Sequence, residues 1–184
     1  MNGSVRVETR AKADTAATVN GSIHLADGAQ VGRAHTVNGD ITLEKQATVS
    51  RDASTVNGAL KLAPGSAVNG ALTNVNGGID IDDAHIGNGI ATVNGDIHIT
   101  GHAVVDGGIK VGKANQGGNS FFGIHFGSNS SHMPRIVIGA GATVKGPLTF
   151  ERPVKLYVSD QANVAGPISG AKAVAFSGTA PPNL

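Results

Sequence analysis

The sequence predicts an all-β fold: a single-stranded parallel β-helix, or solenoid, with triangular coils of about 18–20 residues. Three observations predict it. An Asn-Gly phrase returns at a nearly fixed interval, aliphatic residues recur about every sixth position between its copies, and the chain is rich in Gly but poor in aromatic residues. A fixed period of this length is the sequence signature of a solenoid, in which each coil packs only on its neighbours.

Six copies of the Asn-Gly phrase, preceded by Val in all but the first, follow one another at intervals of 18 or 19 residues. Its Gly suits a backbone conformation that is costly for other residues, so the phrase predicts a corner of the coil. On successive coils the Asn side chains would stack and form a ladder of amide hydrogen bonds, with ligand binding as the alternative. The predicted ladder comprises Asn20, Asn38, Asn57, Asn76 and Asn94, with Asn2 in the same phase.

Aliphatic residues about six positions apart predict three short strands per coil, because three such steps make eighteen residues. The series runs Val19, Leu25, Val31, Val37, Leu43 and Val49, so we expect the Val of each phrase to fill the core. Successive coils would pair as parallel strands about 4.8 Å apart. We expect roughly eight or nine coils, wound right-handed because right-handed parallel crossovers predominate, with left-handed winding as the alternative.

The pattern divides residues 1–176 of one β-helix domain into three parts. Regular coils occupy 1–112, an inserted loop occupies 113–135, final coils occupy 136–176, and a loose tail follows at 177–184. Insertions in solenoids often carry the binding function. The loop contains Phe121, Phe122 and Phe126, which we expect to form an apolar patch for a partner, a membrane surface or self-association, or else to cover a side of the solenoid.

Composition narrows the classes of partner. A net charge of +1 gives no global field that favours nucleic acid, the absence of Cys excludes thiolate sites, and no apolar run approaches the ~18 residues of a transmembrane segment. The N-terminus has no signal peptide, yet Met1 starts in phase with the repeat. We therefore expect a missing upstream segment and export to the periplasm or cell surface, with a cytoplasmic location as the alternative.

Candidate reactive side chains are few, and no cofactor or metal is expected. None of the seven His shows a metal-ligand spacing. One coil carries an acidic cluster, Asp80, Asp82 and Asp83, and the next coil carries Asp96. Carbohydrate-cleaving β-helices use acidic groups with Lys or Arg on one outer face. Here we expect no basic residue stacked on both sides of the acidic residues. Threonines one residue before each Val are expected to face solvent, with an ice-binding face as the alternative; this column is Thr18, Thr36, Thr55, Asn74 and Thr92.

Two segments resemble known families. Residues 136–148, Ile-Val-Ile-Gly-Ala-Gly-Ala-Thr-Val-Lys-Gly-Pro-Leu, resemble a winding of the bactofilins, bacterial polymer-forming β-helix proteins. The Thr-Val-Asn-Gly-Asp-Ile units at 36–41 and 92–97 are similar to bacterial β-solenoid families described as adhesins. The resemblance implies right-handed triangular windings without catalytic residues, end-to-end assembly for the first family and export for the second.

These observations together favour a non-enzymatic structural or interaction protein, adhesin-like, of the bacterial cell envelope. A bactofilin-like cytoskeletal polymer is the first alternative, and a carbohydrate-active β-helix enzyme is the second. Expected partners are a second copy of the chain or an envelope protein; carbohydrate is possible without support from any motif.

Overall fold

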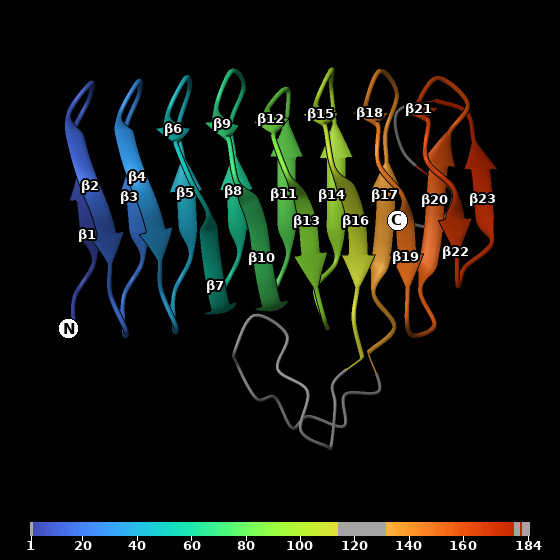
Figure 1. Ribbon diagram of the computed structural model, residues 1–184, viewed down its shortest axis with the longest axis horizontal. Helices are drawn as coiled ribbons and strands as arrows, with labels where there is room; N and C mark the ends of the chain where they lie inside the picture. Colours follow the sequence, from blue (N-terminus) through green and yellow to red (C-terminus); the bar gives the residue numbers. More distant parts are fainter. Residues whose placement is uncertain (1, 114–131, 179–180, 182–184) are drawn as a thin grey trace.

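The computed structural model describes residues 2–113, 132–178 and 181 as a parallel β-solenoid (Figure 1). The described residues form strands and turns and no helix. Nine strands stack along one face of the solenoid, so the chain makes about eight turns, within the predicted number of coils. The right-handed winding stays a prediction.

The first face is a nine-stranded parallel sheet in which the inward side chains are aliphatic. Ile23 stands beside Ile41 and Leu25 beside Leu43, with the polar pair His24 and Thr42 between them pointing outward. The strands are β1 (Val5–Val7), β3 (Ile23–Leu25), β5 (Ile41–Leu43), β8 (Leu60–Leu62), β11 (Ile79–Asp82), β14 (Ile97–Thr100), β17 (Arg135–Ile138), β20 (Lys155–Ser159) and β23 (Ala173–Phe176).

The second sheet covers two faces, because the long strands β2 (Lys12–Ala17) and β4 (Gln30–His35) bend across the corner between them. The second face continues with β6 (Thr48–Val49), β9 (Ala67–Val68), β12 (His85–Ile86), β15 (Val104–Val105), β18 (Thr143–Val144) and β21 (Asn163–Val164). The third face continues with β7 (Ala53–Asn57), β10 (Ala71–Asn76), β13 (Gly89–Thr92), β16 (Gly108–Val111), β19 (Leu148–Phe150) and β22 (Ile168–Ser169). Each coil therefore has the three sides that the six-residue period predicts.

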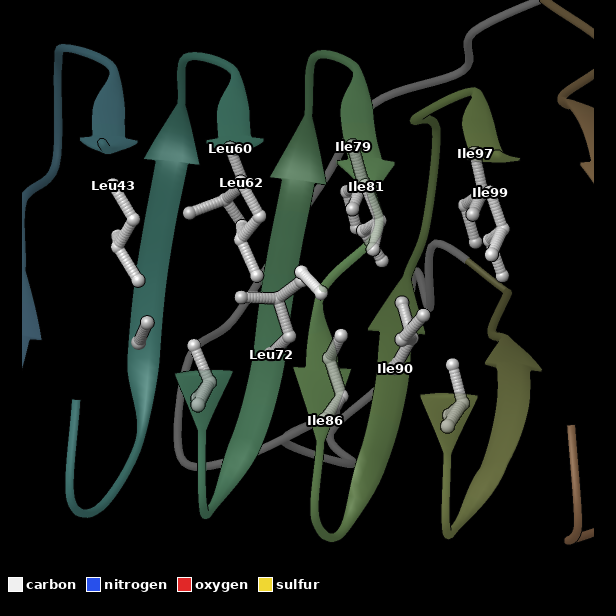
Figure 2. Close-up of a cluster of buried hydrophobic side chains, with 14 of the residues drawn as sticks. Leu43, Leu60, Leu62, Leu72, Ile79, Ile81, Ile86, Ile90, Ile97 and Ile99 are labelled. Carbon is white, nitrogen blue, oxygen red and sulfur yellow. The ribbon is translucent and has the colours of Figure 1, made fainter. Parts of the chain in front are cut away.

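The core is a set of stacked aliphatic columns between the three faces. Leu43, Leu60, Leu62, Ile79 and Ile81 point inward from the first face toward side chains of the opposite sheet (Figure 2). Their relative exposures are 3% or less, because the coil above and the coil below each cover them. Removing this apolar surface from water is the main term that favours folding, and it accrues only when coils stack.

The coil register survives the inserted loop. β14 pairs with β17, and β16 pairs with β19, although residues 112–134 separate the two coils in sequence. The insertion lies at the corner where earlier coils carry Asn-Gly, since Thr92 stands beside Val111. β16 ends at Val111 and β17 begins at Arg135, the last residue of the predicted loop.

The Thr-Val-Asn-Gly phrase is oriented differently from the prediction. Thr36 is fully buried and points inward, whereas Val19 points outward and is 44% exposed. The expectation that the threonines face solvent was wrong, so the ice-binding alternative lacks an exposed row of threonines. The expectation that the valines fill the core was wrong for Val19, Val37 and Val56, which are exposed or partly exposed, whereas Val75 and Val93 are buried. The third-face strands continue inward–outward alternation from Ala34 to Thr36, which places Val37 outside.

Candidate functional site

The Asn column forms a continuous hydrogen-bonded ladder along one corner of the solenoid. Each Nδ2 donates to the Oδ1 of the Asn on the preceding coil, at 2.8–2.9 Å, from Asn20 bonded to Asn2 up to Asn94 bonded to Asn76. Every interior amide thus uses one donor and one acceptor within the ladder. The column is built as structure, because its side-chain amides are engaged with one another.

Arg152 ends the ladder at the corner where the insertion leaves the solenoid. Its Nη1 donates to the Asn94 side-chain oxygen and, at 3.0 Å, to the Val93 carbonyl, while Nη2 donates to the His132 carbonyl at 2.8 Å. The Arg152 guanidinium thus donates to Asn94 in place of the Asn side chain that the next coil would supply if the ladder continued. No repeat spacing marks Arg152, so sequence reasoning missed it.

Asp96 holds the chain that returns from the insertion. One carboxylate oxygen, Oδ1, accepts a hydrogen bond from the Arg135 backbone N–H at 2.8 Å and lies 2.9 Å from Nε2 of His132. Together, Arg152 and Asp96 hold the two ends of the His132–Arg135 segment: Arg152 binds His132, and Asp96 binds Arg135. The sequence grouped Asp96 with an acidic cluster, but the structure gives it this anchoring contact.

The remaining acidic residues lie along the first face, beside a shallow depression of about 350 Å³. Asp80 stands between Lys61 on the preceding coil and His98 on the next, with Asp80 Oδ1 3.2 Å from His98 Nδ1. Asp82 accepts a hydrogen bond of 3.1 Å from the Thr100 hydroxyl. The expectation that no basic residue flanks Asp80 on both sides was wrong, although the column spacing of 19 and 18 residues could have revealed Lys61 and His98.

The pKa shifts of Asp80 and His98 favour an ion pair between the two side chains. The hydrogen bond from His98 lowers the pKa of Asp80 against the opposing effect of burial, and nearby Lys61 acts in the same direction. The hydrogen bond to Asp80 raises the pKa of His98. Glycoside cleavage needs one carboxylic acid with a raised pKa to protonate the leaving oxygen, so Asp80 is poorly suited to that role.

Histidine–carboxylate pairs recur from coil to coil. Besides His98, His85 Nε2 lies 2.7 Å from Asp106, and His102 Nδ1 lies 3.4 Å from Asp83. Asp106 also lies 2.7 Å from Lys145, and this contact, followed by His85, lowers the pKa of the Asp106 carboxyl. In the described residues no group of three or more His, Asp or Glu is arranged to hold a metal ion. Like the bonds of the Asn ladder, these ion pairs join side chains of neighbouring coils.

A second depression of about 510 Å³ lies on the third face. The outward positions of the strands that line it carry small residues, among them Gly89, Ala91 and Gly108. Pro147 lines one end. Lys110 contributes a charged side chain that is paired with Glu151 at 2.9 Å, a contact that lowers the pKa of the Glu151 carboxyl.

Phe121, Phe122 and Phe126, the predicted binding patch, lie outside the described residues. The part of the chain that the structure describes holds no helix long and apolar enough to cross a membrane. Comparisons with protein-family models, with curated proteins and with solved structures found no match to the chain. The fold and the coil-to-coil contacts are therefore the basis for any functional proposal.

Proposed function

We propose that this chain is a non-enzymatic structural or interaction protein of the bacterial cell envelope, an adhesin-like β-helix that serves as a rigid rod. The observation that carries the proposal is the unbroken coil-to-coil bonding. The Asn ladder joins the coils from Asn2 to Asn94, and the stacked core continues past it. Nine strands at the usual spacing give a rod about 38 Å long. A rod of this kind holds a binding segment at a fixed place.

The anchoring of the insertion supports an interaction role. Arg152 and Asp96 bond the returning chain at His132 and Arg135. On the outgoing side the Lys113 backbone N–H donates to Glu151 at 3.4 Å, so the described residues that flank 114–131 are bonded to the solenoid on both sides. A loop on a rigid scaffold is a common arrangement for binding. In this proposal Phe121, Phe122 and Phe126 contact the partner, an envelope protein.

Location and partner binding are tested separately. In source cells, an antibody to the chain should find it in the envelope fraction; recovery in the cytosol alone would overturn the envelope role. Chemical cross-linking should capture a partner with the natural chain and fail after joint replacement of Phe121, Phe122 and Phe126 by Ser. The matched control replaces Ile168 and Val174, exposed apolar residues elsewhere, by Ser and should keep the cross-link.

End-to-end self-association is the second candidate, supported by the end coils. Within the described residues β1 pairs only with β3, and β23 pairs only with β20, so each has an edge without a strand partner. Ile168 and Val174 in the last coil are 39% and 50% exposed. Open edges and exposed apolar residues favour pairing with another chain.

Sedimentation and electron microscopy of the purified chain test this candidate. Filaments that disappear when Ile168 and Val174 are both replaced by Lys would support a polymer. A single monomeric species across the accessible concentration range would rule it out.

A further inference from the structure

Asn-Gly peptides are chemically weak points, and this chain has eight of them. The Gly backbone nitrogen can attack the Asn side-chain carbon Cγ, because Gly places no Cβ in the way. A bond forms between that nitrogen and Cγ, the bond from Cγ to Nδ2 breaks, and ammonia leaves with the proton from the Gly nitrogen. Water then opens the resulting succinimide ring to an aspartate or isoaspartate residue.

The structure divides the eight peptides into two groups. Six belong to the ladder, where the side-chain amides are held between coils. The other two, Asn69-Gly70 and Asn88-Gly89, lie at the corner between the second and third faces. Both of these Asn side chains are exposed, and neither makes a hydrogen bond within the part of the chain that the structure describes.

We propose that the ladder shields its asparagines from succinimide formation and that Asn69 and Asn88 are the sites at which the folded protein is converted to aspartate or isoaspartate. Attack requires Cγ to turn toward the following nitrogen. A ladder residue such as Asn57 must first break its bonds to Asn38 and Asn76, whereas Asn69 and Asn88 turn freely. Their conversion puts a new negative charge beside the third-face depression, which Asn88 lines.

The chain contains its own matched pair for this comparison. Residues 56–60 and 68–72 are the same pentapeptide, Val-Asn-Gly-Ala-Leu. Both Asn side chains are exposed; the first is bonded in the ladder, and the second, at the other corner, makes no hydrogen bond in the described part of the chain. The following backbone N–H is hydrogen-bonded in both copies, from Gly58 to Asn76 O at 3.0 Å and from Gly70 to Arg51 O at 2.9 Å. The engagement of the side-chain amide is thus the feature that separates them.

The expected rates follow from the number of bonds broken. Each net hydrogen bond is worth a factor of about five, so an interior ladder Asn should react about 25-fold more slowly than Asn69. Asn2, which is bonded through its Oδ1 alone, should react about fivefold more slowly. In concentrated urea the ladder is absent and the two identical pentapeptides should react at equal rates.

The experiment incubates the full chain in mildly alkaline buffer, with and without urea, and follows each Asn by peptide mapping with mass spectrometry. Cleavage after Lys61 separates the two pentapeptides. Equal rates for Asn57 and Asn69 in the folded protein would overturn the proposal. So would a rate for Asn57 that stays low in urea, because protection would then be independent of the fold.

A variant tests the ladder directly. Asn57→Ala removes one bond from Asn38 and one from Asn76, so both should react about fivefold faster while Asn20 is unchanged. Asn69→Ala is the matched control and should leave every ladder rate unchanged. Unchanged rates at Asn38 and Asn76 in folded Asn57→Ala would refute the shield. If that variant does not fold, the comparison of the natural chain with and without urea decides.

Discussion

Buried threonines bind the glycine carbonyls of the preceding coil. Thr36 Oγ1 donates to Gly21 O at 2.8 Å, Thr18 bonds Gly3 O in the same way, and Thr55 bonds Gly39 O. Where Asn74 replaces Thr, its Nδ2 makes the equivalent bond to Gly58 O. A buried carbonyl without a partner is costly, so these hydroxyls explain a polar column inside an aliphatic core.

Replacing Thr36 by Val should therefore lower the free energy of unfolding by about 1–2 kcal/mol, because shape is kept while one buried hydrogen bond is lost. The control is Thr48→Val, on a half-exposed strand position whose hydroxyl makes no hydrogen bond in the described part of the chain. It should change stability by less than about 0.5 kcal/mol. Urea unfolding measures both, and equal effects would contradict the role assigned to Thr36.

The pair of Asp80 and His98 gives the molecule a window of pH in which it is more stable. The interaction that raises the pKa of His98 stabilises the folded protein fully below pH 6.5. This stabilisation is lost as the pH rises through the pKa that His98 has in the folded protein. The interaction that lowers the pKa of Asp80 stabilises the folded protein fully above pH 3.8. This stabilisation is lost as the pH falls through the pKa that Asp80 has in the folded protein. Asp96 favours the charged imidazole as well, and Arg135 opposes it.

His98→Gln should thus cost most between pH 3.8 and 6.5 and less well above 6.5. Both side chains are about half exposed, so the difference is about 0.5–1 kcal/mol after solvent screening. Urea midpoints across pH measure it, and Asp80→Asn should remove the same window. A cost for His98→Gln that is independent of pH would show that the pair contributes packing alone.

At the scale of the element, the Asn-Gly corner depends on close stacking of glycines. A Cβ added to Gly58 would lie 2.0 Å from Gly39 O, and one added to Gly39 would lie 2.1 Å from Gly21 O. Both contacts are with backbone, so only separation of the coils could relieve them. Gly is needed here chiefly for close approach, in addition to the positive φ of 135° at Gly77.

Gly58→Ala should lower the free energy of unfolding by at least about 2 kcal/mol, because separating two coils also stretches their hydrogen bonds. Gly78→Ala is the control, since its Cβ would meet nothing closer than Asp80 Oδ2 at 4.0 Å. This second change should be neutral or slightly stabilising through the unfolded chain. Calorimetry compares the two, and similar losses would argue against the stacked corner.

At the scale of the whole molecule, stability is shared between neighbouring coils. Each coil contacts mainly the coils on either side, so local opening is easiest where a coil has lost a neighbour or a connecting bond. The corner at the insertion is such a place, because the ladder stops at Asn94 and Arg152 completes it.

Arg152→Met should raise amide hydrogen exchange in residues 89–97 and 132–138 while coils before residue 50 stay protected. The guanidinium bonds Val93, Asn94 and His132, and hydrogen bonds to charged groups are worth about 1.5–3 kcal/mol. Arg51→Met, which loses a 2.9 Å contact with Asp14 at another corner, is the control. Exchange mapped by mass spectrometry should be unchanged around Val93 in the control; the same increase there would contradict the local role of Arg152.

Much of the fold follows from the sequence, because a repeat of fixed length repeats one local solution. The period predicted the parallel coils and their three sides. Lys61 and His98 beside Asp80 also follow from column spacing, once charges are compared between coils. Arg152 does not, since it reaches the ladder from a loop 58 residues after Asn94.

The pentapeptide Val-Asn-Gly-Ala-Leu shows where sequence ends and tertiary structure begins. In both copies the sequence by itself determined a corner after a short strand. Only the stacking decided that Val56 faces outward and Asn57 joins the ladder, while Val68 is buried and Asn69 stays outside the ladder. The physical reason is that a side chain's direction depends on the phase of its strand against the neighbouring coils, which five residues cannot specify.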